Sequence, residues 1–177
     1  LLKGVVASHA DRITATLDYA RAQNNNHLIS EAAGLYTAAA LLPDHPRAEY
    51  WRETGWRWLQ HAIQTQIHPD GSYVQHSTNY LRLVLQIALF IKRIAESAGH
   101  SFPEESSQRL AAATNWLGAL IDKESRGVPN LGGNDGAYFL PLTNDAFSDF
   151  RPVLQVARQA FSALVFKTPE EMSLWLA

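Results

Sequence analysis

Three stretches of the chain collect side chains that could bind an anion or move a proton. The first runs from Asn24 to His27, the second from Tyr73 to Tyr80, and the third holds Asn130, Asn134 and Asp135. Amide and imidazole N–H groups can donate hydrogen bonds to an anion, and a tyrosine hydroxyl can give or take a proton. If the three stretches meet, they would suit a ligand such as a sugar that carries a carboxylate.

Helical segments flank these stretches and must position them. No part of the sequence shows sustained strand alternation, and seven segments have helical character, at roughly 4–22, 26–42, 47–67, 77–98, 104–122, 147–165 and 168–176. Two of them, 47–67 and 104–122, carry a single apolar stripe, whereas 26–42 and 77–98 are apolar almost all round. A helix that is apolar on every side must be buried on every side. The sequence therefore predicts an all-α fold in which buried and one-faced helices alternate.

This alternation is typical of an incomplete α/α toroid, in which inner and outer antiparallel helices form hairpins that pack side by side. A plain helical bundle is the alternative that periodicity leaves open. If the helices run alternately up and down, the connections near 22–25, 68–79 and 122–146 share one mouth of the ring. The N-termini of the buried helices lie at that mouth as well, and their unpaired N–H groups favour a bound anion.

Composition limits the classes of function. Of 177 residues, 46% are hydrophobic and 18% are charged, and we expect residues 1–177 to form a single helical domain. A formal net charge of −2 without a basic run argues against a nucleic-acid partner, and no apolar stretch is long enough for membrane insertion. There is no cysteine, and the seven histidines show no zinc spacing, so we expect neither a metal nor another cofactor.

Three blocks of sequence allow a comparison with known enzymes. They are Asn25 to Leu35 (NNHLISEAAGL), Asp70 to Tyr80 with its DGSY and STNY runs, and Pro129 to Gly136. In this order they resemble the heparinase II/III and alginate-lyase group of polysaccharide lyases. The resemblance implies an incomplete toroid followed by β-sandwich domains. It further implies a fragment of a longer bacterial enzyme, periplasmic or secreted, with N-terminal helices and a C-terminal β-sandwich missing here.

The resemblance also implies roles for particular residues. Asn26, together with His27, would neutralise the carboxylate of an acidic polysaccharide, and Tyr80 would stand at the scissile bond as proton donor or acceptor. We expect these three side chains to line one cleft, with the loop from Asn130 to Gly136 beside them. The further candidates for substrate binding are Asn25, Gln75, His76, Arg82, Asn134 and Asp135.

The implied reaction is β-elimination at a uronic acid. Removing the C5 proton places a second negative charge beside an existing carboxylate, so hydrogen-bond donors must spread that charge, each worth roughly 3 kcal/mol when well placed. A base takes the C5 proton while an acid protonates the departing O4. A tyrosine can do either if neighbouring cations polarise its phenol, and Arg82 and His76 are the nearest candidates in the sequence.

The chain departs from the family pattern at several positions. The run Gln75-His76-Ser77 stands where Glu-Gln-Ser is expected, Leu81 stands where histidine is common, and Gly133 stands where an acidic residue is expected. Two other functions therefore stay open. One is a toroid that binds glycans without cutting them, and the other is a glycoside hydrolase, which needs two carboxylates flanking the scissile bond.

The candidate residues also have purely structural interpretations. Asn24 and Asn25 could cap a helix, and His27 could pair with Glu31 one turn along. Tyr80 could be a core tyrosine with a bonded hydroxyl, and an Asn-Asp-Gly run often turns the chain. The helical spacing of the tryptophans favours core packing over stacking on sugars; these are Trp51, Trp56, Trp58 and Trp116.

Overall fold

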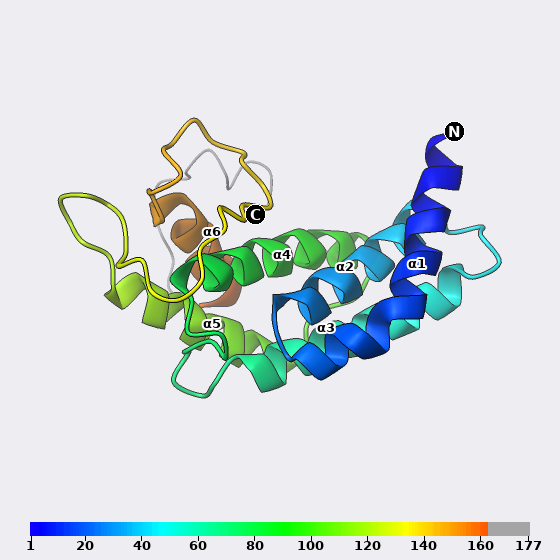
Figure 1. The fold of residues 1–177 in the computed structure, drawn as a ribbon, viewed down its shortest axis with the longest axis horizontal. Coiled ribbons are helices and arrows are strands. Elements are labelled where there is room, and N and C mark those ends of the chain that lie inside the picture. Colours follow the sequence, from blue (N-terminus) through cyan, green and yellow to red (C-terminus); the bar gives the residue numbers. More distant parts are fainter. Residues whose placement is uncertain (163–177) are drawn as a thin grey trace. The chain divides into compact units, whose positions relative to one another are not determined.

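The computed structural model describes residues 1–162, which contain six helices (Figure 1). They are α1 (Leu2–Gln23), α2 (Asn26–Leu41), α3 (Ala48–Gln66), α4 (Thr78–Ser97), α5 (Glu104–Ala119) and α6 (Arg151–Phe161). Within these residues the β-structure is limited to an isolated bridge between Ile67 and Tyr73. The predicted all-α class is confirmed, as are six of the helical segments. The seventh, at 168–176, lies outside the described residues.

The chain divides into two compact units, Leu1–Gln66 and Ile67–Ala177. In the first unit, α2 packs against both α1 and α3. Gly55 lets α3 approach α2 closely, since a Cβ added there would lie 2.6 Å from the backbone nitrogen of Tyr36. Helix α2 is buried on several sides, whereas α1 buries only Ala10, Leu17 and Ala20. The predicted contrast between buried and one-faced helices is therefore present in this unit.

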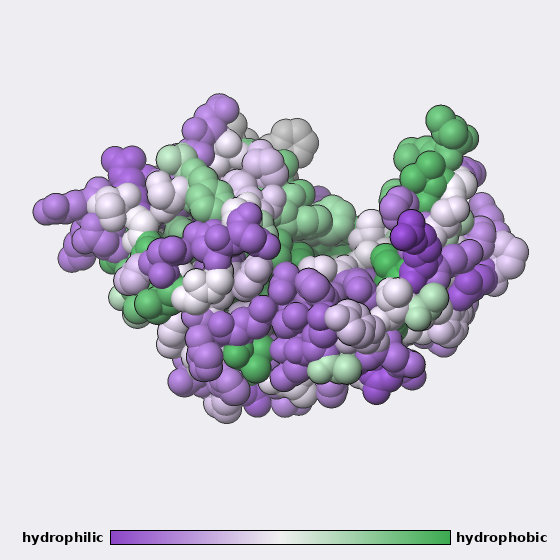
Figure 2. All heavy atoms as spheres, viewed as in Figure 1, coloured by the Kyte–Doolittle hydropathy of each residue, from purple (hydrophilic) through white to green (hydrophobic). Residues whose placement is uncertain are grey.

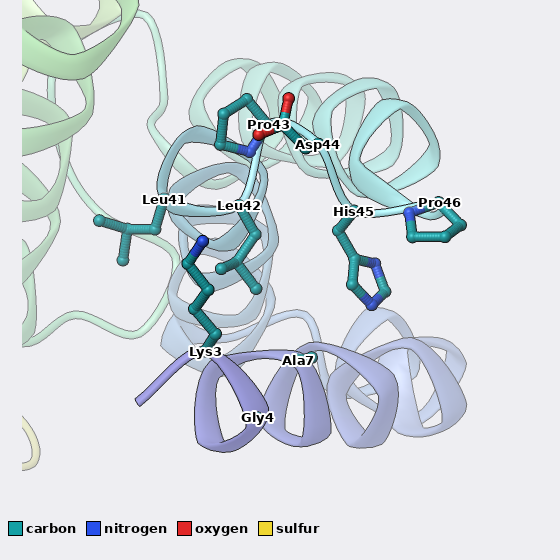
Figure 3. Close-up of a pocket in the computed structure, with 9 residues that line it drawn as sticks. All are labelled: Lys3, Gly4, Ala7, Leu41, Leu42, Pro43, Asp44, His45 and Pro46. Atoms are coloured by element: carbon teal, nitrogen blue, oxygen red, sulfur yellow. The ribbon is translucent and has the colours of Figure 1, made fainter. Parts of the chain in front are cut away.

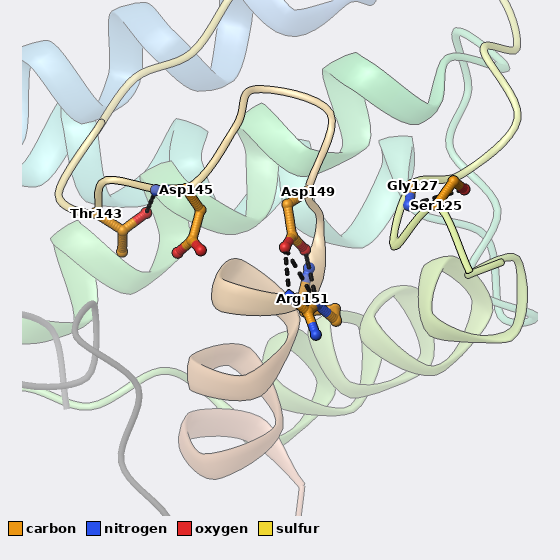
Figure 4. Close-up of polar contacts among 6 residues, drawn as sticks. All are labelled: Ser125, Gly127, Thr143, Asp145, Asp149 and Arg151. Carbon is orange, nitrogen blue, oxygen red and sulfur yellow. Dashed lines mark hydrogen bonds and ion pairs between the residues drawn. The ribbon is translucent and has the colours of Figure 1, made fainter. Parts of the chain in front are cut away.

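The second unit is built on α4. Thirteen of its 20 residues are buried, and α5 and α6 pack against α4 and against each other. The connection from α5 to α6 spans residues 120–150 and contains no regular secondary structure. Near its end the carboxylate of Asp149 accepts hydrogen bonds from the backbone and guanidinium of Arg151 (Figure 4). Pro152 in the first turn then sets the start of α6.

Apolar side chains are exposed at the beginning of α1. Leu1, Leu2 and Val5 are all exposed, and Figure 2 shows hydrophobic side chains gathered at the N-terminal end of the chain. Nearby, Lys3 and Ala7 from α1 border a hollow of about 370 Å³, which residues 41–46 close from the other side (Figure 3). Among the described helices, none has the length and apolarity needed to cross a membrane.

Candidate active site

The turn between α1 and α2 carries the first group of candidate residues. Asn24 ends α1 in a left-handed conformation, with φ at 46°. The side chain of Asn25 caps α2 by accepting a hydrogen bond of 3.0 Å from the backbone N–H of His27. Gln66 on α3 donates to the carbonyl of Asn25 at 3.0 Å, which fixes the turn to the rest of the unit. The capping interpretation of Asn25 is therefore confirmed.

Asn26 and His27 open the first turn of α2. Asn26 is half-buried and His27 is exposed. Nδ1 of His27 lies 2.7 Å from Oε1 of Gln23, so this imidazole is bonded toward the preceding helix end. One turn further, Oε2 of Glu31 is buried without a hydrogen-bond partner among the described residues, and burial raises the pKa of Glu31. The donors expected to face a substrate carboxylate thus stand at one end of a buried helix.

A polar hollow of about 530 Å³ adjoins this turn. The guanidinium of Arg21 lies over the Trp58 ring at 3.8 Å, and His61 meets the same ring edge-on. The hollow is lined by Asp18, Arg21, Ala22, Asn24, Leu28, Trp58 and His61. Trp51 is fully buried, as core packing predicts, but Trp58 is only half-buried. Helical spacing did not separate these two tryptophans.

The turn before α4 carries the second group of candidates. Asp70 closes it by accepting hydrogen bonds from the backbone N–H and the hydroxyl of Ser72, at 2.9 and 2.7 Å. Gly71 has φ of +90°, and a Cβ there would lie 2.2 Å from the carbonyl oxygen of Ala112, so this position requires glycine. Gln75 is half-buried and His76 is exposed, with φ of 52°.

Tyr80 stands in the first turn of α4 and is half-buried. Ser77 caps this helix by accepting a hydrogen bond of 3.0 Å from the backbone N–H of Tyr80, and its own hydroxyl donates to the carbonyl of Gly133 at 2.5 Å. The Tyr80 hydroxyl donates to Oδ2 of Asp135 at 3.1 Å. A side chain at Gly133 would press on the Tyr80 ring, since its Cβ would lie 3.2 Å from Cε2.

The pKa values of Tyr80 and Asp135 are shifted in opposite directions. Burial and the neighbouring carboxylate of Asp135 both raise the pKa of Tyr80. The backbone N–H of Ala137 and the Tyr80 hydroxyl lower the pKa of Asp135. At neutral pH the phenol is therefore protonated and the carboxylate is ionised. The partner of the phenol is an anion, whereas the sequence led us to expect a cation.

Arg82 lies on the same helix but is fully buried. Its guanidinium donates to the carbonyl of Phe147 and, at 2.7 Å, to Oδ1 of Asn79. The rings of Phe147, Phe150 and Tyr138 surround it at 4.1, 4.1 and 4.7 Å. Burial lowers the pKa of Arg82 to about 10. In the structure this side chain holds the loop that follows α5.

Arg82 belongs to a polar stripe on α4, formed by Thr78, Asn79, Arg82 and Gln86. All four side chains are buried, and each donates a hydrogen bond to a backbone carbonyl of residues 129–147. Within this loop, Asn134 donates to Oδ1 of Asn130 at 2.8 Å and accepts from the backbone of Gly136 at 3.1 Å. The Asn-Asp-Gly run thus turns the chain. Because the stripe is hydrogen-bonded to the loop on both sides of Asp135, it fixes the position of this residue.

Comparison with known proteins identifies the family. A profile described as the heparinase II/III N-terminus matches residues 4–147. The chain belongs to this family. It is 26% identical over 175 residues to a heparin-sulfate lyase of Bacteroides thetaiotaomicron, and the match covers 97% of the chain and 24% of that lyase. A heparin-sulfate lyase of Bacteroides stercoris is 29% identical over 82 residues, or 45% of the chain and 12% of the lyase.

A shorter match is to a glutamate–tRNA ligase of Bifidobacterium adolescentis, 35% identical over 83 residues, or 47% of the chain and 15% of that protein. No solved structure gives a significant match. The chain thus spans about a quarter or less of the curated relatives that it matches. The profile covers most of the chain and all three sequence blocks, and the predicted resemblance is confirmed.

Within this heparinase II/III domain, the structure brings together one part of the predicted site. Tyr80 and Asp135 meet at the start of α4, although Asp135 lies 55 residues further along the chain, and Asn134 precedes Asp135 in the same loop. Asn26 and His27 belong to the first unit, so their place in a cleft shared with Tyr80 stays a prediction. Within residues 1–162, no group of three or more metal-ligating side chains is placed to hold an ion.

Proposed function

We propose that this chain is part of the helical toroid domain of a polysaccharide lyase, which cleaves acidic polysaccharides at a uronic acid by β-elimination. The observation that carries the proposal is the placement of Tyr80. It stands in the first turn of a buried helix inside the region that matches the family, and its hydroxyl makes an exposed hydrogen bond to Asp135. A core tyrosine would bury its hydroxyl.

The proposed mechanism assigns roles to three side chains. Asn26 and His27 donate hydrogen bonds to the substrate carboxylate, where they stabilise the charge that builds as the C5 proton leaves. Tyr80 transfers protons at C5 and O4. We further propose that Gln75, His76 and Asn134 contact the sugar chain. A C-terminal domain completes the enzyme, which is periplasmic or secreted and needs no cofactor.

The carboxylates favour a lyase over a glycoside hydrolase. A hydrolase needs one carboxyl group with a raised pKa as its acid, near a second carboxylate. In the second unit, the hydrogen bonds of Asp70 with Ser72 and of Asp135 with Ala137 and Tyr80 lower the pKa of both carboxylates. Burial raises the pKa of Glu31, but its Oε2 is buried and therefore does not reach a bound sugar.

The test is a rate assay on the full-length protein with a panel of uronate polymers. A lyase creates a C4–C5 double bond, so its products absorb ultraviolet light, whereas hydrolase products do not. In Tyr80→Phe we expect kcat to fall by roughly 10²-fold or more with little change in substrate binding. In Asn26→Ala we expect a loss of about two orders of magnitude, also mainly in kcat.

Matched controls separate chemistry from folding. Tyr19 is exposed on α1 and Asn115 is exposed on α5, so Tyr19→Phe and Asn115→Ala should leave both turnover and melting unchanged. Unchanged turnover in Tyr80→Phe would remove Tyr80 from the mechanism. Reducing ends released without ultraviolet absorbance would indicate a hydrolase, and polymer binding without any product would indicate a glycan-binding domain.

A further inference from the structure

Tyr80 faces a chemical problem as a base. A phenol takes a proton only from its deprotonated form or while losing its own proton to a partner. In the structure the hydroxyl partner is the carboxylate of Asp135, which opposes formation of a phenolate. The cation nearest in sequence, Arg82, is enclosed by aromatic rings and bonded to the carbonyl of Phe147. The second route, loss of the proton to a partner, is the one that the geometry provides.

We propose that Tyr80 and Asp135 form a proton relay, in which Asp135 accepts the hydroxyl proton of Tyr80 as Tyr80 takes the C5 proton of the sugar. This inference rests on the proposed lyase function. It assigns Asp135 a role that acts through Tyr80, whereas the sequence suggested a direct contact with the substrate. An ionised carboxylate would repel the uronate, so a role behind the tyrosine suits its charge better.

The carboxylate is held in the orientation that a relay requires. Its Oδ1 accepts a hydrogen bond of 3.0 Å from the backbone N–H of Ala137, which leaves Oδ2 directed at the Tyr80 hydroxyl, 3.1 Å away. The Tyr80 backbone and the carbonyl of Gly133 are both bonded to the Ser77 hydroxyl. The Ser77 hydroxyl therefore links the start of α4 to the loop beside Tyr80 and Asp135.

The charges around the pair fix the protonation states. Burial and Asp135, from the loop, raise the pKa of Tyr80, and Tyr80 in turn adds to the effect of burial in raising the pKa of Tyr73, in the turn before α4. The pKa of Asp135 is lowered, so this carboxylate is ionised at neutral pH. Phenolate would be a small fraction of Tyr80 at that pH, whereas the proton acceptor of the relay is fully available.

The proton balance closes over the two steps of the elimination. First, the C5–H bond breaks, an O–H bond forms on Tyr80, and the former hydroxyl proton moves to Asp135, leaving an enolate on the sugar. Second, the electron pair at C5 forms the C4–C5 double bond as the C4–O4 bond breaks. O4 takes a proton from Tyr80, which regains one from Asp135. The enzyme ends as it began, and no oxidant or further reactant is needed.

The relay predicts an unusual response to Asp135→Asn in the full-length protein. The amide still accepts a hydrogen bond from Tyr80 but cannot take its proton, so kcat should fall by roughly 10²-fold or more at every pH while KM changes little. The pKa of Tyr80 should fall, because a negative charge has gone. Tyrosine labelled with ¹³C at Cζ reports that pKa by NMR, and Tyr80→Phe assigns the signal.

A mechanism in which Tyr80 acts as a phenolate predicts the opposite change in the rate of Asp135→Asn. If Tyr80 acts as a phenolate, lowering its pKa makes the base more abundant, so Asp135→Asn would react faster near neutral pH. Either a faster or an unchanged Asp135→Asn enzyme overturns the relay. Asp122→Asn is the control, because Asp122 is an exposed turn carboxylate in the same connection, bonded to Ser125. Equal losses in both variants would also overturn it.

These outcomes separate the relay from the function on which it rests. An inactive Tyr80→Phe enzyme combined with an active Asp135→Asn enzyme refutes the relay and keeps the lyase. Full activity in Tyr80→Phe, or no unsaturated product from the unaltered protein, refutes the role of Tyr80 and the relay together. A loss of activity in Asp135→Asn that tracks a lowered melting temperature assigns Asp135 to folding and refutes the relay alone.

Discussion

Replacing Arg82 with methionine should detach the α5–α6 connection from α4. The guanidinium is fully buried and donates to the Phe147 carbonyl and the Asn79 side chain. Each acceptor left unpaired costs about 1–3 kcal/mol, and loss of the cation from its ring cage costs up to about 2 kcal/mol. Methionine fills most of the volume and removes a buried charge, which offsets part of this loss. We expect a net destabilisation of about 3 kcal/mol.

For a domain of this size, about 3 kcal/mol lowers the melting temperature by roughly 6–12 °C. Thermal melting of the full-length protein measures this change, and amide hydrogen exchange over residues 137–147 locates it. Arg82→Lys keeps the charge but not the planar fork, so its loss should be intermediate.

The matched control for this substitution is Arg93→Met. Arg93 is exposed on the same helix, so its replacement should change stability by no more than about 0.5 kcal/mol. Equal melting of Arg82→Met and Arg93→Met would refute the reasoning. So would a large loss of stability with unchanged exchange in the loop, because the guanidinium would then stabilise the core and not the connection.

Two further predictions concern the second unit. Gly71→Ala should lower the free energy of unfolding by well over 2 kcal/mol, because its Cβ would collide with Ala112. Gly99→Ala, also at positive φ but in open space, should lower it by about 1 kcal/mol. Similar melting temperatures for the two variants would contradict this. Burial opposes ionisation of Asp149, but its bonds with Arg151 outweigh this and lower its pKa below the usual 3.8. Its contribution to stability is therefore present above about pH 4 and lost as pH falls through the folded pKa. Asp149→Asn should flatten that acid dependence in melts from pH 2 to 7, and parallel curves would count against it.

Local patterns predicted the helices well because burial leaves a direct mark on composition. Segments 26–42 and 77–98 are apolar almost all round, and both are buried helices; the cap at Asn25 was among the alternatives that the sequence offered, whereas the cap at Ser77 was not predicted. The start of α6 was less certain. Periodicity placed it near 147, but residues 147–150 belong to the connection, and Pro152 marks the first turn. A pattern of apolar residues cannot show where a preceding loop stops.

The contacts that define the site were harder to predict because they join distant residues. His27 has a possible partner four residues away in each direction, and it bonds to Gln23, which the sequence does not favour over Glu31. The bond between Tyr80 and Asp135 crosses a loop without periodicity. A usable signal did exist in α4, where Thr78, Arg82 and Gln86 recur every four residues in an otherwise apolar helix. Buried polar groups need partners, and such spacing indicates one adjoining segment.

The stripe on α4 has a consequence for how this domain can change. Each of its four side chains bonds to a main-chain carbonyl of the loop, at Pro129, Ala137, Leu140 and Phe147. A carbonyl is the same whichever side chain its residue carries. Many loop residues can therefore be replaced without breaking these four hydrogen bonds. Replacing any of the four helix residues, in contrast, removes the side chain that donates one of them. Divergence in ligand preference, natural or engineered, is expected to accumulate in the loop while α4 keeps its sequence.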